Sequence, residues 1–93
     1  MATKEVKFKV TPSGGIKAYW IRVGSENITL MGGKGSILLQ TVCNQILIWH
    51  MVGNPGSSLG IVGEVDDLPV VKVEASKIPS GEHEGAGTKR FQM

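Results

Sequence analysis

Residues 45–52 read QILIWHMV, and this stretch indicates the fold more strongly than any other part of the chain. In an extended strand, successive side chains point to opposite faces of the sheet. One face would then carry Ile46, Ile48, His50 and Val52, and the other would carry Leu47, Trp49 and Met51. Both faces are apolar, whereas a strand with one solvated face alternates apolar and polar residues. The sequence therefore predicts a strand that must be covered on both of its sides.

Turn-forming residues divide the rest of the chain into short segments. The 93 residues include 13 glycines and 4 prolines, and valine and isoleucine together number 18, against 10 for leucine and alanine. β-Branched side chains fit a pleated strand better than a helix. Seven candidate strands lie between the turns, at residues 4–11, 16–23, 27–31, 36–42, 45–52, 58–65 and 70–76.

Short strands joined by frequent turns predict an all-β fold. We expect residues 1–93 to form one domain, a single antiparallel β-sandwich of about seven or eight short strands. Residues 79–87 contain three glycines and no apolar periodicity, so we predict a Gly-rich loop there. Residues 88–93 are predicted to form a last edge strand, with a frayed tail as the alternative.

Trp49, within the segment LIWHM at residues 47–51, resembles the tryptophan that packs between the two sheets of immunoglobulin-like sandwiches. The resemblance lies at the level of the fold and implies an immunoglobulin-like architecture. The paired cysteines of antibody domains are absent, because Cys43 is the only cysteine. The resemblance therefore implies no particular function.

Composition also limits the compartment and the partners. A single cysteine excludes an intrachain disulfide, and no run of about 18 apolar residues is present, so membrane insertion is not expected. Residues 1–7 alternate charged and apolar side chains instead of forming a signal peptide. The protein is expected to be soluble and cytoplasmic as written, or secreted if a leader has been removed. A net charge of +2 does not point to nucleic acid, which is not an expected partner.

One segment matches a hydrolase motif. Residues 56–60 read GSSLG, which fits G-x-S-x-G with Ser58 as the nucleophile, and Asp66, Asp67 and His83 follow in the order that such hydrolases use. That chemistry needs a strand, a sharp turn and a helix, whereas a strand-like segment follows here. We expect a turn between two strands and a protein that is not an enzyme. A small serine hydrolase stays as a remote alternative.

No metal site and no cofactor are predicted. Residues 32–36, GGKGS, offer backbone amides and a lysine to an anion, but they lack the first glycine and the Ser or Thr of a phosphate-binding loop. A hairpin turn is the better interpretation. Glu82, His83 and Glu84 lie in the predicted Gly-rich loop without the spacing of metal ligands, and we interpret them as solvated charges.

Four side chains are candidate binding residues, namely Tyr19, Trp20, Trp49 and His50. Tyr19 and Trp20 are adjacent, so in a strand they face opposite ways and only one can lie in the core. The other ring would suit a peptide or a sugar, because amphipathic rings offer large contact area at small entropic cost. His50 is either a core histidine with one partner or part of a recognition surface. Trp49 or its strand neighbours are expected at a subunit or partner interface, or else between two covered sheets.

Together these features favour a non-enzymatic interaction module or a self-associating protein, with a protein partner or a homodimer at the apolar strand. Burying a further face of large apolar side chains would contribute roughly 5–8 kcal/mol before the costs of association. A carbohydrate-binding module that uses Tyr19 or Trp20 is the alternative. It requires that the stems of Lys17 and Arg22 leave the ring uncovered.

Overall fold

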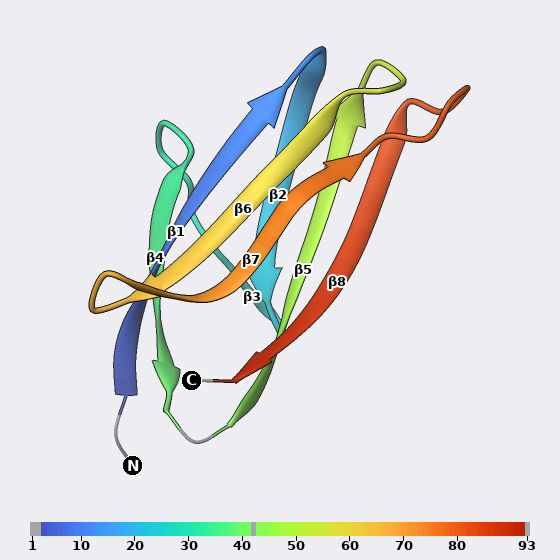
Figure 1. The fold of residues 1–93 in the computed structure, drawn as a ribbon. Helices are drawn as coiled ribbons and strands as arrows, with labels where there is room; N and C mark the ends of the chain where they lie inside the picture. The colour runs from blue at the N-terminus through green and yellow to red at the C-terminus, as the bar shows by residue number, and fades with distance from the viewer. Residues whose placement is uncertain (1–2, 42, 93) are drawn as a thin grey trace.

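The computed structural model describes residues 3–41 and 43–92, and within them the chain forms eight strands and no helix (Figure 1). The strands are β1 (Thr3–Ser13), β2 (Ile16–Val23), β3 (Glu26–Asn27), β4 (Lys34–Gln40), β5 (Asn44–Gly53), β6 (Ser58–Val65), β7 (Leu68–Lys77) and β8 (Glu84–Gln92). The predicted all-β fold with seven or eight strands is confirmed. Val42 and Met93, which end two of the predicted strands, lie outside the described residues.

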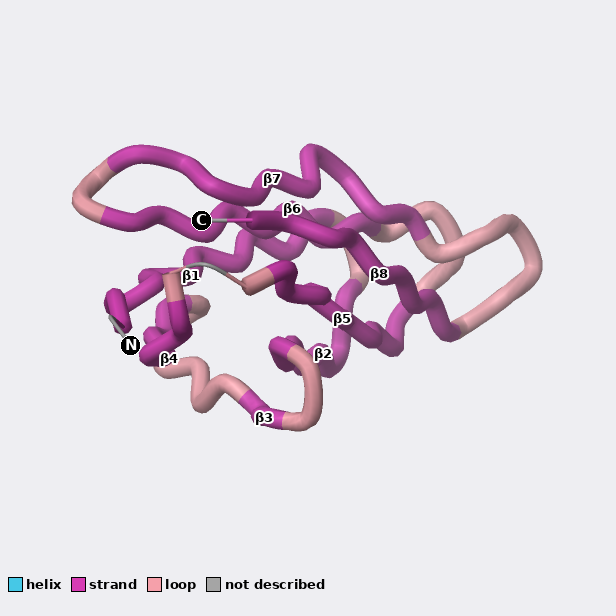
Figure 2. Tube along the Cα trace, turned by 90° about the horizontal axis from the view of Figure 1, so that it is seen from below, coloured by secondary structure: helices cyan, strands magenta, loops and turns pink. Residues whose placement is uncertain are grey.

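The strands form two antiparallel sheets that pack together as a β-sandwich. One sheet has the order β4-β1-β6-β7, and the other has the order β3-β2-β5-β8. Figure 2 shows the two layers, with β1, β6 and β7 in one and β2, β5 and β8 in the other. The molecule is elongated, with principal extents of 45 × 22 × 20 Å. The sandwich predicted from the sequence is therefore confirmed.

The immunoglobulin-like strand order is not confirmed. In constant-type immunoglobulin domains the first two strands share a sheet, whereas β1 and β2 lie in opposite sheets here (Figure 1). Among the described elements, only the β2–β3 and β6–β7 connections join neighbouring strands of one sheet. The chain shares a buried tryptophan with that architecture but follows a different path between the layers.

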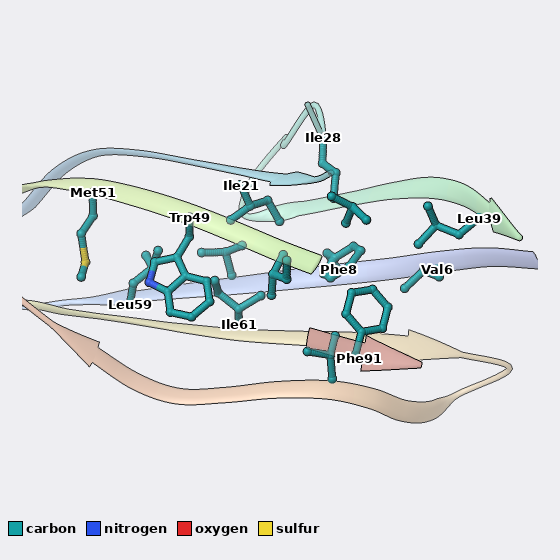
Figure 3. Packing of buried hydrophobic residues seen from close by; sticks show 14 of the residues in the cluster. Val6, Phe8, Ile21, Ile28, Leu39, Trp49, Met51, Leu59, Ile61 and Phe91 are labelled. Carbon is teal, nitrogen blue, oxygen red and sulfur yellow. The ribbon is translucent and has the colours of Figure 1, made fainter. Parts of the chain in front are cut away.

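Alternation along the strands builds the core. β1 turns Val6, Phe8 and Val10 inward and leaves Lys7 and Lys9 exposed. The facing sheet contributes three buried side chains from β5, namely Leu47, Trp49 and Met51. In Figure 3 the labelled side chains of Val6, Phe8, Trp49 and Met51 lie in the space between the two layers. The inward side chains of β1 and β5 thus pack together in one core.

The third strand is shorter than predicted, because the chain changes sheets directly after it. The strand predicted over residues 27–31 is reduced to the two residues of β3, which pair with β2. β4 belongs to the other sheet, so the intervening residues cross between layers. Ile28 still packs in the core at 6% exposure. Gly32 and Gly33 then turn the chain with φ values of 61° and 80°, which glycine adopts without a steric penalty.

The last strand starts inside the segment predicted to be a Gly-rich loop, at Glu84. Gly85 and Gly87 lie directly opposite Met51 and Trp49 in the β5–β8 pairing. A Cβ on Gly87 would lie 2.6 Å from Cε2 of Trp49, and a Cβ on Gly85 would lie 2.7 Å from Cε of Met51. These glycines are therefore strand residues that leave room for two large side chains. The loop prediction is wrong for this part of the segment, and the loop ends before Glu84.

Candidate functional site

Trp49 serves the packing of the sandwich. Its side chain is 6% exposed, and its indole Nε1–H donates a 2.9 Å hydrogen bond to Oγ of Ser76, which lies on β7 in the opposite sheet. Figure 3 shows the ring pointing into the core near Ile61. Of the two positions that the sequence leaves open, an interface or the space between two sheets, the structure places Trp49 between the sheets. Its role is therefore structural, and it offers almost no surface to a partner.

Tyr19 and Trp20 occupy opposite faces of β2, as their adjacency predicts. Tyr19 is half-buried and packs against the core. Trp20 points the other way and is 41% exposed. Trp20 is therefore the tryptophan that remains open to contact.

The outward side chains of β2, β5 and β8 form the surface that surrounds Trp20. Strand pairing sets them side by side in rows across the sheet. Starting at the end of β5 near Gly53, the four rows are Ala18–Val52–Glu84, Trp20–His50–Ala86, Arg22–Ile48–Thr88 and Ile46–Arg90. We call this surface the Trp20 face. It is the second side of β5, opposite to the side that carries Trp49.

The centre of the Trp20 face is apolar and only partly shielded. Ile46 is 38% exposed, and Ile48 and Val52 are half-buried between their neighbours on β2 and β8. The sequence predicts that this side of the strand is covered. Among residues 3–41 and 43–92, the cover consists of neighbouring side chains of the same sheet.

Trp20, His50 and Arg22 form a stacked cluster on this face. The rings of Trp20 and His50 lie opposite each other in the β2–β5 pairing, with centroids 5.7 Å apart and planes inclined by 23°. Cζ of Arg22 lies 5.3 Å from the centroid of Trp20, within the range of a cation–π contact. Nε2 of His50 lies 3.8 Å from Oε1 of Glu84, an ion pair only when the histidine is protonated. His50 is thus part of a surface cluster and not of the core.

The outer face of the other sheet has a different character. One of its rows sets Lys34, Lys9, Val62 and Lys72 side by side on β4, β1, β6 and β7. Glu64 follows Val62 on the same side of β6, paired with β1. This face is dominated by charged side chains, as expected of a surface in contact with water. Leu38, which pairs with Glu5 and is 66% exposed, also lies on this face. The two outer faces differ in that the exposed tryptophan lies on the Trp20 face, whereas Leu38 and Val62 share the other face with lysines and glutamates.

The residues of the G-x-S-x-G match do not come together. Ser58 opens β6, and Asp66 and Asp67 follow the other end of this strand, about 23 Å away at the usual rise per residue. A nucleophile elbow would need a helix directly after Ser58, whereas the strand β6 begins at this residue. The neighbouring Ser57 is 4% exposed, and its Oγ accepts a 2.8 Å hydrogen bond from the N–H of Gly15. The motif therefore spans the end of a turn and the first residues of β6, and Ser57 ties this turn to the β1–β2 loop.

The other chemistry-bearing residues are also dispersed. Within residues 3–41 and 43–92, no three His, Cys, Asp or Glu side chains gather closely enough to hold a metal ion. Cys43 is a free thiol whose Sγ donates a hydrogen bond of 3.2 Å to Oε1 of Gln40. In the same described part of the chain, no helix has the length and apolar character needed to cross a membrane.

No protein-family model matches this chain, and neither does any curated protein or any solved structure. Function is therefore inferred from the residues of this chain. The Trp20 face is the surface that they distinguish most clearly.

The structure adds residues of β8 to this face that sequence reasoning did not connect with the aromatic side chains, namely Glu84, Ala86, Thr88 and Arg90. Glu84 and Ala86 were missed because the beginning of β8 was predicted to be a loop. Thr88 and Arg90 lie in the predicted edge strand, but the sequence does not show that this strand pairs with β5. A signal was present in the spacing of Gly85 and Gly87, since glycine at alternate positions of a strand marks the close approach of large groups. The sequence alone does not show which groups approach.

Proposed function

We propose that this protein is a non-enzymatic interaction module that binds another protein surface through the Trp20 face. The observation that carries the proposal is the exposure of Trp20 and Ile46 on a sheet face with an apolar centre. Apolar patches with a polar rim are typical of protein-contact sites. Here the rim is charged, with Glu84 at one end and Arg22 and Arg90 towards the other.

The side chains of this face are those that dominate binding energies at protein interfaces. Tryptophan and arginine are enriched among the interface residues whose truncation to alanine weakens binding by about 2 kcal/mol or more. A tryptophan side chain that is 41% exposed offers about 100 Å² for burial, which is worth about 2.5 kcal/mol. Trp20 alone is therefore large enough to anchor a contact, and the aliphatic side chains of Ile46, Ile48 and Val52 add area.

Carbohydrate binding is the alternative, and the local geometry favours it less. Tyr19 packs against the core, so it offers little free ring surface. The indole of Trp20 is already in contact with His50 and Arg22. A sugar needs a free ring face on which to stack, whereas a protein surface can also cover the ring edge and the neighbouring isoleucines. Hydrolysis through Ser58 has no supporting arrangement.

Photo-crosslinking from a defined position tests the proposal. The full chain carries p-benzoylphenylalanine in place of Ala86, in the same row as Trp20, and is irradiated in an extract of cells in which the protein occurs. The matched control carries the same probe in place of Val62, at the centre of the charged outer face. We expect a discrete protein adduct from position 86 that is lost in the Trp20→Ala background.

The adduct identifies the partner as a second copy or as a different protein by its mass. Equal labelling from both positions would contradict the proposal, and so would an adduct that survives Trp20→Ala. Circular dichroism of each labelled chain confirms that the probe leaves the β-sandwich intact. Absence of any adduct at position 86 would remove the contact function altogether.

A further inference from the structure

We propose that the partner of the Trp20 face is a second copy of this chain, packed face to face about a twofold axis that runs across the strands. The proposal rests on the contact function proposed above and names its partner. It is carried by the arrangement of charge along the face. Glu84 lies in the first row, whereas Arg22 and Arg90 lie in the third and fourth rows. Opposite charges thus mark opposite ends of one apolar surface.

Two kinds of twofold axis can relate identical sheets that pack face to face, because the axis must lie in the plane of contact. An axis along the strands brings like ends together. It would gather Arg22 and Arg90 of both copies at one end and both Glu84 side chains at the other. An axis across the strands reverses one copy end for end. Electrostatic complementarity therefore favours the second arrangement.

An axis midway between the second and third rows gives a complementary partner to each row. The first row of one copy then faces the fourth row of the other, so Glu84 meets Arg90 twice. The second row faces the third, so Trp20 of each copy meets Arg22 of the other. The apolar side chains of β5 cover one another at the centre. One sequence thus supplies both halves of two ion pairs and two cation–π contacts.

The size of the face predicts a weak and reversible dimer. Three strands and the ten residues of β5 span about 14 Å by about 34 Å, or roughly 500 Å² per copy. Two such faces bury roughly 1,000 Å², which lies at the low end of specific interfaces. We therefore expect a dissociation constant on the order of tens of micromolar.

Sedimentation velocity of charge-exchange variants tests this arrangement. Glu84→Arg and Arg90→Glu each replace two attractive pairs per dimer by two repulsive ones. Each is expected to weaken the dimer about tenfold. An equimolar mixture of the two single variants regains both attractive pairs in the heterodimer, and the double variant regains them in its homodimer. Both samples should dimerise nearly as well as the wild type.

Glu5→Arg is the matched control, because it makes the same change of charge on the outer face of the opposite sheet. It should leave the dimer unchanged, and circular dichroism should be the same for all variants. A wild type that stays monomeric up to near-millimolar concentration would overturn the second copy as partner. In that case, an adduct with a different protein from position 86 would preserve the contact function. A dissociation constant that is unchanged in both single variants would overturn the twofold axis across the strands. A mixture of the two variants that fails to restore dimerisation would do the same.

Discussion

Replacing Gly87 by alanine tests how the indole of Trp49 packs against the neighbouring strand β8 of the same sheet. Gly85 and Gly87 both face inward on β8, opposite Met51 and Trp49. Neither glycine has a positive φ, so the backbone permits alanine at both positions. The two substitutions add the same methyl group and differ only in what it meets. Gly85→Ala is therefore the matched control for Gly87→Ala.

The cost follows from the contacts of each added Cβ. At Gly87 it would lie 2.6 Å from Cε2 and 3.0 Å from Cη2 of Trp49, and the hydrogen bond to Ser76 holds the indole in place. Overpacking of this kind costs about 1–3 kcal/mol, offset by about 0.4–1 kcal/mol because alanine lowers the entropy of the unfolded chain. We expect a net loss of about 1–2 kcal/mol. At Gly85 the nearest atom is the terminal methyl of Met51, which can swing aside, so the net change should be close to zero.

Urea unfolding followed by circular dichroism measures both changes as shifts of the midpoint at constant slope. A second comparison places Gly87→Ala in a Trp49→Phe background, where the smaller ring removes the clash. The cost of alanine should then fall to near zero, a coupling of about 1–2 kcal/mol. Equal costs at Gly85 and Gly87 would show that the clash with the indole is not the cause. So would a cost at Gly87 that persists with phenylalanine at position 49.

Three further substitutions probe the stability of the sandwich. Ser76→Ala should destabilise the fold by about 1–3 kcal/mol, because it leaves the buried Nε1–H of Trp49 without an acceptor; an unchanged urea midpoint would show that the hydrogen bond contributes nothing. Asp67→Gly should stabilise the protein by about 1 kcal/mol, because Asp67 has a φ of 65° and glycine avoids that strain. Asp66→Gly should gain less stability, since it also removes the 3.0 Å ion pair with Lys4. A lower melting temperature for Asp67→Gly would exclude backbone strain as the dominant effect at that turn.

Local patterns predicted the strands whose limits are set by turn residues. The ranges 16–23 and 58–65 match β2 and β6 residue for residue. Both are flanked by turns that contain glycine or aspartate. Such turns end a strand whichever strand it pairs with. The alternation of β1 likewise indicated its buried side without knowledge of its neighbours.

Features that depend on distant residues were not predictable in this way. Gly87 has the appearance of a loop residue until Trp49 is placed opposite it. β3 is short because the chain must reach the other sheet, and sheet membership is decided by pairing rather than by local sequence. The Trp20 face shows the same limit, because Arg22 and Glu84 share a surface only through β5 between them. The sequence showed that both sides of β5 are apolar, but it did not show which strands pair with β5.

Fluorine NMR can distinguish the side of β5 that packs in the core from the side that forms the Trp20 face. Both tryptophans are replaced by 5-fluorotryptophan, and a soluble gadolinium chelate broadens the signals of exposed rings. The chain has two tryptophans on opposite sides of one sheet, Trp49 at 6% and Trp20 at 41% exposure. We expect that the chelate never broadens the Trp49 signal, whereas it broadens the Trp20 signal in dilute samples and progressively less as the protein concentration rises towards millimolar. A Trp49 signal that is broadened in dilute samples would disprove its burial between the sheets, and a Trp20 signal whose broadening is independent of concentration would disprove self-association through the Trp20 face.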